Sequence, residues 1–206
     1  MDRRLFLPAE WAADAPRQAG VPRAIVFRTK PELALELVAD AAAAGRPFRG
    51  VAGDGLYGDS PTFCRGVRAL GEWYVHDSSA DAWVWRAEPG PVPPGRKPTR
   101  GRPTINASVT TKPERVDEVG ARPPASAWRR VAVAEGSQGP IVCDHAEVAA
   151  CFNEKGMPGG PGRLLVRRSI GQQPELKYHR TNAPPEVLLA ALAGVRSKRW
   201  SIGQDF

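Results

Sequence analysis

The feature that most constrains the fold is a short, mostly apolar run that ends in an acidic residue between glycines. The run begins at Phe48, passes through Val51 and Ala52, and ends in Gly53-Asp54-Gly55, with Ser60-Pro61 shortly after. Such a run is typical of a buried strand, and glycines allow the tight turn that ends it. Ser60 is suited to cap a helix whose first residue is Pro61. The stretch therefore predicts a strand that ends at Asp54 and a helix that begins at Ser60.

Asp54 allows two interpretations. A carboxylate at the carboxyl end of a buried strand lies where open α/β sheets commonly place catalytic and metal-binding groups. The simpler interpretation is that Asp54 caps a turn, and the motif by itself favours this one.

Strand and helix signals alternate through the first part of the chain. A helix is expected from about Thr29 to Ala44, because Pro31 suits an early helical position and Gly45 can end the helix. The other expected elements are strands at 1–8, 24–27, 48–54 and 73–75, a loop with a short helical turn over 9–23, and a helix over 60–70. This order predicts a parallel sheet in an α/β fold.

The sequence changes character from residue 79 to about residue 170. Pro89–Pro103 is rich in proline, glycine and arginine and could grip phosphates, although an exposed, solvated loop is the preferred interpretation. Short strands are expected at 83–85, 128–133 and 141–142. We interpret the region as a small, poorly ordered β-rich insertion. The chain then has three parts: an α/β part over 1–78, the insertion over 79–170, and a return to the α/β domain over 171–206.

Two strands and a helix are expected toward the C-terminus. Residues 163–169 and 176–180 have the apolar content of strands and can pair as a hairpin. Pro184-Pro185-Glu186 predicts the start of a helix. Arg196–Phe206 resembles the first turns of a further helix that the end of the chain truncates.

Composition favours an anionic partner and a reducing environment. The net charge is +7 and the pI about 9.8, a balance that suits binding to nucleic acid. Three cysteines at unrelated spacings (Cys64, Cys143 and Cys151) argue against a disulfide framework and suit a reducing cytosol. The three histidines are scattered and form no zinc pattern. No apolar run approaches the length of a membrane span, so we expect a soluble, cytoplasmic protein.

Several segments in order resemble one known family. They are Asp2–Trp11, Phe27–Ala34, Gly53–Gly58, Trp128–Arg130 with Glu135–Pro140, Leu165–Ser169 and Arg199–Ile202. In this arrangement the chain resembles the catalytic domain of bacterial insertion-sequence transposases of the DDE type, in the branch with a β-rich insertion. The resemblance implies an α/β fold that is part of a ribonuclease-H-like domain, with the first strands missing and an inserted β-rich region. It also implies DNA, in the form of insertion-element ends, as the partner.

The resemblance assigns a catalytic and metal-binding role to Asp54. In such enzymes three carboxylates hold two divalent ions, one for the attacking oxygen and one for the leaving oxygen. Mg²⁺ suits this work because it prefers oxygen ligands. Asp54 corresponds to the acid that ends the fourth strand of the family sheet. The net charge of +7 and six arginines favour contact with DNA, and Arg196 and Arg199 are the residues expected to make it; the simpler interpretation of each is an ordinary surface charge. The six are Arg129, Arg130, Arg167, Arg168, Arg196 and Arg199.

The other two carboxylates of the family pattern have no match in this chain. The first belongs to a strand upstream of residue 1, because Asp2 falls in the family's third strand. The third closes an Arg-x-x-x-Glu pattern, and here Arg199 is followed at that position by Gly203. Asp205 would face away from position 203 on a helix, since two residues turn it by about 200°. Asp59 reads more simply as a residue at a helix start.

Three hypotheses follow for the function. The chain is an inactive, truncated transposase that retains part of the fold. Alternatively, it is a DNA-binding or regulatory remnant that acts as a homo-oligomer or with a full-length transposase. A third possibility is a product that barely folds, because a sheet without its first strands has an unpaired edge.

Overall fold

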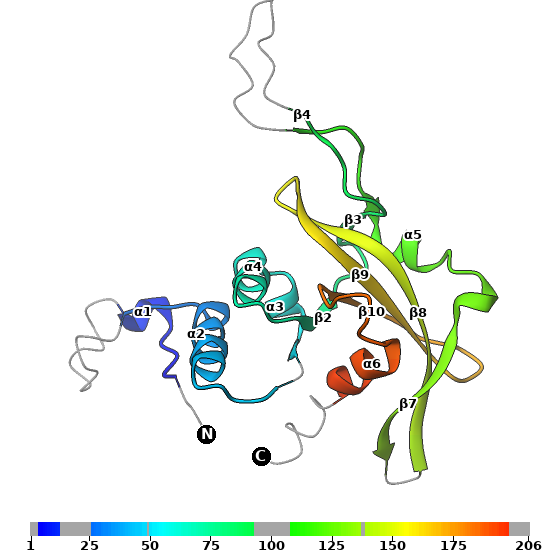
Figure 1. Ribbon diagram of the computed structural model, residues 1–206, viewed down its shortest axis with the longest axis horizontal. Helices are drawn as coiled ribbons and strands as arrows, with labels where there is room; N and C mark the ends of the chain where they lie inside the picture. The colour runs from blue at the N-terminus through cyan, green and yellow to red at the C-terminus, as the bar shows by residue number, and fades with distance from the viewer. Residues whose placement is uncertain (1–3, 13–25, 49, 93–107, 137–138, 198–206) are drawn as a thin grey trace, which may run out of the picture.

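The computed structural model describes residues 4–12, 26–48, 50–92, 108–136 and 139–197. In these ranges eight strands form one sheet, in the order β1-β2-β10-β9-β8-β3-β6, with β7 paired to β8 (Figure 1). The strands are β1 (Val51–Gly53), β2 (Tyr74–Ser78), β3 (Trp83–Trp85), β6 (Glu114–Arg115), β7 (Arg129–Gly136), β8 (Gly139–Glu154), β9 (Met157–Ser169) and β10 (Leu176–Thr181). The short strands β4 (Pro91–Val92) and β5 (Ser108–Val109) pair separately. The helical elements are α1 (Ala9–Ala12), α2 (Lys30–Ala43), α3 (Gly55–Gly58), α4 (Pro61–Ala69), α5 (Val116–Gly120), η2 (Ala125–Ala127) and α6 (Leu189–Ser197).

The helices α2 and α4 begin where the sequence predicts. Thr29 caps α2 in a capping box, because the Glu32 amide donates to the Thr29 hydroxyl and the Thr29 amide donates to the Glu32 carboxylate at 2.7 Å. The Ser60 hydroxyl accepts from the amide of Phe63, and Pro61 is the first residue of α4. Both predictions are confirmed, and they hold because a cap is a local interaction that neighbouring residues specify.

The parallel sheet expected from the alternating order is confirmed only for one pair of strands. β1 runs parallel to β2, whereas β10, β9, β8, β3 and β6 follow in antiparallel pairs. The strands of the middle region are longer than expected, because β8 has 16 residues where a short strand at 141–142 was predicted, and β9 has 13. Asp144, His145 and Glu147 interrupt the apolar pattern of β8, and glycines, prolines and arginines interrupt that of β9, so only short pieces of the two strands stand out in the sequence. Strands from all three expected parts belong to one sheet, since β10 pairs with β2 on one side and with β9 on the other.

The strands expected at 1–8 and 24–27 do not form in the residues that the structure describes. Residues 4–8 form no strand, and the exposed Leu5 and Phe6 bury no sheet face. Instead Arg4 forms ion pairs with Glu36 and Asp40 of α2, which holds the segment beside that helix. Residues 26–27 also lie outside any strand, and residues 1–3 and 24–25 lie outside the described ranges.

The C-terminal hairpin is confirmed, but the helix after it begins later than expected. β9 and β10 pair in antiparallel register, with Val166 opposite Tyr178. The helix α6 begins at Leu189 and not near Pro184. The Arg163 guanidinium donates to the carbonyls of Pro184 and Val187 at 3.0 and 3.1 Å, which keeps these residues in a turn before the helix. Arg196 belongs to the last turn of α6, and residues 198–206 lie outside the described part of the chain.

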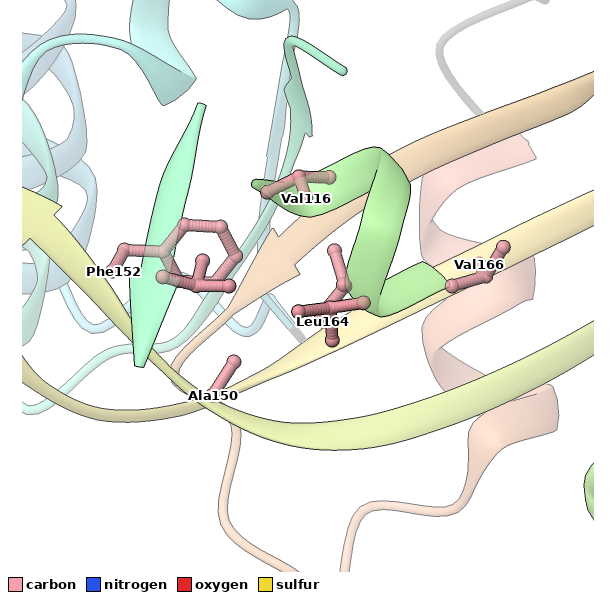
Figure 2. Packing of buried hydrophobic residues seen from close by; sticks show 7 residues of the cluster. Val116, Ala150, Phe152, Leu164 and Val166 are labelled. Atoms are coloured by element: carbon pink, nitrogen blue, oxygen red, sulfur yellow. The ribbon is translucent and has the colours of Figure 1, made fainter. Parts of the chain in front are cut away.

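Buried side chains cover the sheet on both faces. On one face α5 packs over the central strands, where Val116 meets Phe152 and Leu164 (Figure 2). On that same face Phe63 of α4 packs against Tyr74 of β2. The opposite face, which we call the α6 face, buries a cluster of Val75, Leu165, Ala183 and Leu192. Because adjacent residues of a strand point to opposite faces, the register then assigns every neighbouring side chain to one face or the other.

The three cysteines are free and buried, as small core residues would be. None of the helices in the described ranges is long and apolar enough to cross a membrane.

Candidate functional site

Asp54 lies at the carboxyl end of β1 and caps the short helix α3. Its backbone is extended (φ −86°, ψ −172°), and its Oδ1 accepts a hydrogen bond from the amide of Leu56 at 3.1 Å. The structure therefore bears out the turn-cap interpretation. A carboxylate offers about four lone-pair positions, so a capping bond and a ligand bond are compatible with each other in chemical terms.

A second carboxylate, Asp77, leaves the neighbouring strand beside Asp54. The parallel register places Gly53 of β1 opposite His76 of β2, so the next residues, Asp54 and Asp77, emerge side by side. Asp77 lies opposite His179 of β10 and shares the α6 face with Val75, two residues earlier. Two acidic residues thus leave neighbouring strands at the same edge of the sheet.

Asp77 is held in a tight polar cluster with two basic residues. Arg196 of α6 donates from Nε and Nη2 to the two carboxylate oxygens, each at 2.8 Å, and His179 Nδ1 lies 2.9 Å from Oδ1. Burial would raise the pKa of Asp77, but the hydrogen bond with His179 and the charge of Arg196 outweigh it and lower the pKa to about 2. Asp77 is therefore an anion that is already neutralised by its neighbours.

His179 in this cluster is buried and neutral. Burial is the main cause that lowers its pKa, and the hydrogen bond with Asp77 acts in the opposite direction. With Nδ1 bonded to Asp77, its Nε2 has no hydrogen-bond partner among the residues that the structure describes.

The opposite face of the sheet holds α3 in place through a buried ionic network. Arg180 of β10 donates to the carbonyl of Gly58 at 2.9 Å and to Glu154 of β8 at 3.4 Å. Glu154 also accepts from Arg65 of α4 at 2.8 Å, and the Arg180 guanidinium stacks 4.3 Å from the ring of Phe152. A side chain on Gly58 would collide with the backbone carbonyl of Asp77, so α3 lies directly against β2. The turn that carries Asp54 is thereby fixed directly to β2 and β10, and through Arg180 to Glu154 of β8.

His76 completes the packing beneath Asp54. Its ring stacks on Tyr74 with centroids 4.4 Å apart, and its Nδ1 lies 3.7 Å from the sulfur of Cys64. Burial, assisted by the charge of Arg180, lowers the pKa of His76 to about 3. The ring therefore stays neutral and acts as part of the core.

The arginines expected to contact DNA have different environments. Arg196 is paired with Asp77 as described above, and Arg199 lies outside the described ranges. Of the proline- and arginine-rich loop, residues 93–107 also lie outside those ranges.

The sequence did not reveal Asp77, His179, Arg180 or Glu154 as members of this region. The strand expected at 73–75 is the beginning of β2, and its extension by a few residues would have placed Asp77 beside Asp54. No sequence signal pairs Glu154 with Arg180, because the contact depends on the register of β8, β9 and β10.

The described residues do not fit a two-metal centre. Carboxylate oxygens suit Mg²⁺, but within the described ranges no three His, Cys, Asp or Glu side chains come together as a metal site. Asp77 faces Arg196 and His179, which compete with a cation for its oxygens. The position expected for the third acid, Gly203, lies outside the described part of the chain.

Comparison with known proteins adds one finding to this geometry. The family described as DDE superfamily endonuclease matches residues 1–140, which is more than half of the chain. The match includes β1, α3, β2 and therefore Asp54 and Asp77. A search of curated proteins finds no match. Members of this family act on DNA and generally use divalent metal ions, and the mixed α/β structure with its large sheet is compatible with such a nuclease domain. The chain belongs to the DDE superfamily of endonucleases.

Proposed function

We propose that this chain is a transposase-type member of the family that binds DNA but does not by itself carry out strand transfer. The observation that supports the proposal is the pairing of Asp77 with Arg196 and His179. The carboxylate nearest to Asp54 in the sheet is already neutralised, so it does not join Asp54 in holding a metal ion. Gly203 at the third acidic position of the family pattern supports the same conclusion.

Asp54 is the residue proposed to take part in metal binding, with Mg²⁺ as the proposed ion. A single carboxylate does not position two ions for in-line displacement, which is why we propose an inactive chain. The fold proposed for this region is part of a ribonuclease-H-like domain, divided into the parts 1–78, 79–170 and 171–206.

The test is a nuclease and strand-transfer assay with Mg²⁺ or Mn²⁺ on DNA that carries the ends of an insertion element. We expect no metal-dependent cleavage by the purified chain. Cleavage that disappears in Asp54→Asn would overturn the proposal. Asn is chosen because it keeps the helix-capping oxygen, so that a loss of activity reports the carboxylate and not the fold.

A second candidate function is that of a DNA-binding or regulatory protein that acts with a full-length transposase or as a homo-oligomer. The net charge of +7 favours it. Mixing the chain with an active transposase of the same element should change the rate of transposition in a concentration-dependent way. An unchanged rate at saturating concentration contradicts this candidate.

We also propose a cytoplasmic location, which the three free, buried thiols support.

A further inference from the structure

The sheet register separates the arginines of the central strands into two groups. Arg129 of β7 lies opposite His145 of β8, and His145 lies opposite Arg167 of β9. Arg167 in turn lies opposite Lys177 of β10. Residues that are directly opposite one another across strands share a face. These four residues therefore form one row across four neighbouring strands.

The row lies on the α6 face. Leu165, two residues before Arg167, packs against Leu192 of α6. His179, two residues after Lys177, is bonded to Asp77. Since alternate residues of a strand share a face, Arg167 and Lys177 point to the same side as Leu165 and Asp77. The row also lies toward the same end of the sheet at which Asp54 and Asp77 emerge.

The cations of this row are not matched by strong carboxylate partners. Arg167 is half-buried, and no carboxylate or carbonyl of the described residues binds its guanidinium; its Nε is buried without a partner. Arg129 is exposed and donates to the carbonyls of Ser126 and Trp128. Lys177 lies 3.5 Å from Glu175, but both side chains are largely exposed, and such pairs contribute little.

The next residues in the sequence show the opposite behaviour. Arg130 and Arg168 point to the other face of the sheet, and both bind Asp144, at 3.0 and 3.2 Å. Arg168 also stacks 4.1 Å from the ring of Trp128. The charges of Arg130 and Arg168 are therefore partly neutralised by Asp144, and both side chains already have partners within the protein. The sequence contains two adjacent arginine pairs, and the sheet divides each pair between its two faces.

The charge of Arg167 affects the pKa values of two buried histidines, His145 and His179. Burial is the main cause of the lowered pKa of His145, and the charge of Arg167 lowers it further. The same two causes act on His179, where burial again comes first. Both rings therefore stay neutral and add no charge to the row, so its positive charge comes from Arg129, Arg167 and Lys177.

We propose that Arg129, Arg167 and Lys177 form a binding site for the sugar-phosphate backbone of DNA on the α6 face. The inference rests on the proposed function, in that it assumes DNA as the partner. Strands lie about 4.8 Å apart, so the row from β10 to β7 spans roughly 14 Å. That length corresponds to about four nucleotides of axial rise along one DNA strand. The row runs from Lys177 on β10 to Arg129 on β7, away from the strand that ends at Asp54.

The test compares matched pairs of substitutions in the full chain. Binding of a short duplex DNA of arbitrary sequence is measured over about 50 to 200 mM salt. The variant Arg129→Gln/Arg167→Gln removes two charges from the row, and Arg130→Gln/Arg168→Gln removes two charges from the opposite face. We expect the first variant to lower the slope of log affinity against log salt by about 2 and to weaken binding by one to two orders of magnitude at about 0.1 M salt. The second variant should leave the slope close to that of the unmodified protein.

The outcomes separate the inference from the function on which it rests. If the unmodified chain binds no DNA at low salt, the proposed function and the inference both fail. If it binds with a steep salt dependence and the two variants lose affinity equally, DNA binding stands and the site on the α6 face is refuted. A loss confined to the first variant supports the site.

A second comparison guards against misfolding of the half-buried Arg167 or Arg168. The exposed neighbours Arg129 and Arg130 are replaced singly by Gln, and Lys177→Gln is added. Arg129→Gln and Lys177→Gln should each reduce the salt slope by about 1, and Arg130→Gln should not. Equal slopes for all three variants would refute the site without reference to Arg167.

Discussion

Among single residues, Asp77 shows that a carboxylate at a strand end can hold a helix and a neighbouring strand in place. Its two oxygens are bound by Arg196 and His179, which come from a helix and a strand more than one hundred residues further along the chain. A carboxylate that has these partners is ionised in the folded protein well below the pH at which it ionises in the unfolded chain. Its ionisation is therefore coupled to folding.

The coupling predicts an acid dependence of stability. The folded-state pKa of Asp77 is about 2, against 3.8 for the ordinary group. A carboxyl group whose pKa is depressed in the folded state stabilises the folded protein at pH values above its unfolded-state pKa. That stabilisation is lost as pH falls from about 4 toward 2. We expect roughly 2 kcal/mol to be lost in this window, measured by denaturant unfolding at several pH values. Asp77→Asn should be less stable at neutral pH and should lack this part of the acid dependence. Identical pH profiles for both proteins would contradict the assignment.

Single residues could be predicted from the sequence only where their partners are close in the chain. Ser60 was expected as a cap and Thr29 as the approximate start of its helix, and each binds a backbone amide three residues away. Asp54 could be placed at a strand end for the same local reason. The partners of Asp77 depend on how β10 and α6 dock on β2, and no local pattern specifies that docking. The same limit hid the difference between Arg129 and Arg130, which are neighbours in sequence but lie on opposite faces.

At the scale of elements, α6 is attached to the sheet by one apolar and one polar contact. Leu192 packs into the cluster with Val75 and Leu165, while Arg196, one turn later, binds Asp77. Both residues point toward the sheet because side chains four positions apart share a face of a helix. The helix thus packs against β7 as well as against β1 and β2.

Two leucines of this segment allow a matched test of that docking. Leu192 is 0% exposed and Leu188 is 73% exposed. Leu192→Ala should lower the free energy of unfolding by about 2 to 5 kcal/mol, because it removes buried methyl groups and leaves a cavity. Leu188→Ala should change it by less than about 0.5 kcal/mol. Chemical denaturation of both variants checks the prediction, and equal effects would mean that α6 does not dock through Leu192.

The strands of the middle region illustrate why elements with distant partners escape a sequence-based prediction. β8 and β9 contain Pro140, Pro158 and Pro161, and proline is a poor strand residue taken singly. They are nevertheless long, because each pairs with neighbours on both sides for part of its length. Cross-strand pairing therefore outweighs the local preference of these residues.

At the scale of the whole molecule, a buried ionic network joins parts that are distant in sequence. Glu154 at the end of β8 binds Arg180 of β10 and Arg65 of α4, and Arg180 binds the carbonyl of Gly58 in α3. Both Glu154 and Arg180 are nearly inaccessible to solvent. The network therefore ties the central antiparallel strands to the parallel pair that carries Asp54.

Removal of Glu154 should destabilise the entire molecule. Glu154→Leu leaves the buried Arg180 without its carboxylate, and the loss of one partner of a buried pair costs about 3 to 5 kcal/mol. Glu147→Leu breaks a pair with Arg163 in which the carboxylate is partly exposed, so its effect should be below about 1 kcal/mol. Thermal and denaturant unfolding of the two variants measure the difference. A Glu154→Leu protein as stable as Glu147→Leu would show that the network is dispensable.

Gly58 carries a consequence for the position of Asp54. The backbone of Asp77 occupies the space that a side chain at position 58 would need, so α3 can approach β2 only with hydrogen there. Even a methyl group would force the turn outward and carry the acidic group at its start along with it. The placement of Asp54, the carboxylate that we propose for metal binding, thus depends on the absence of a side chain four positions later.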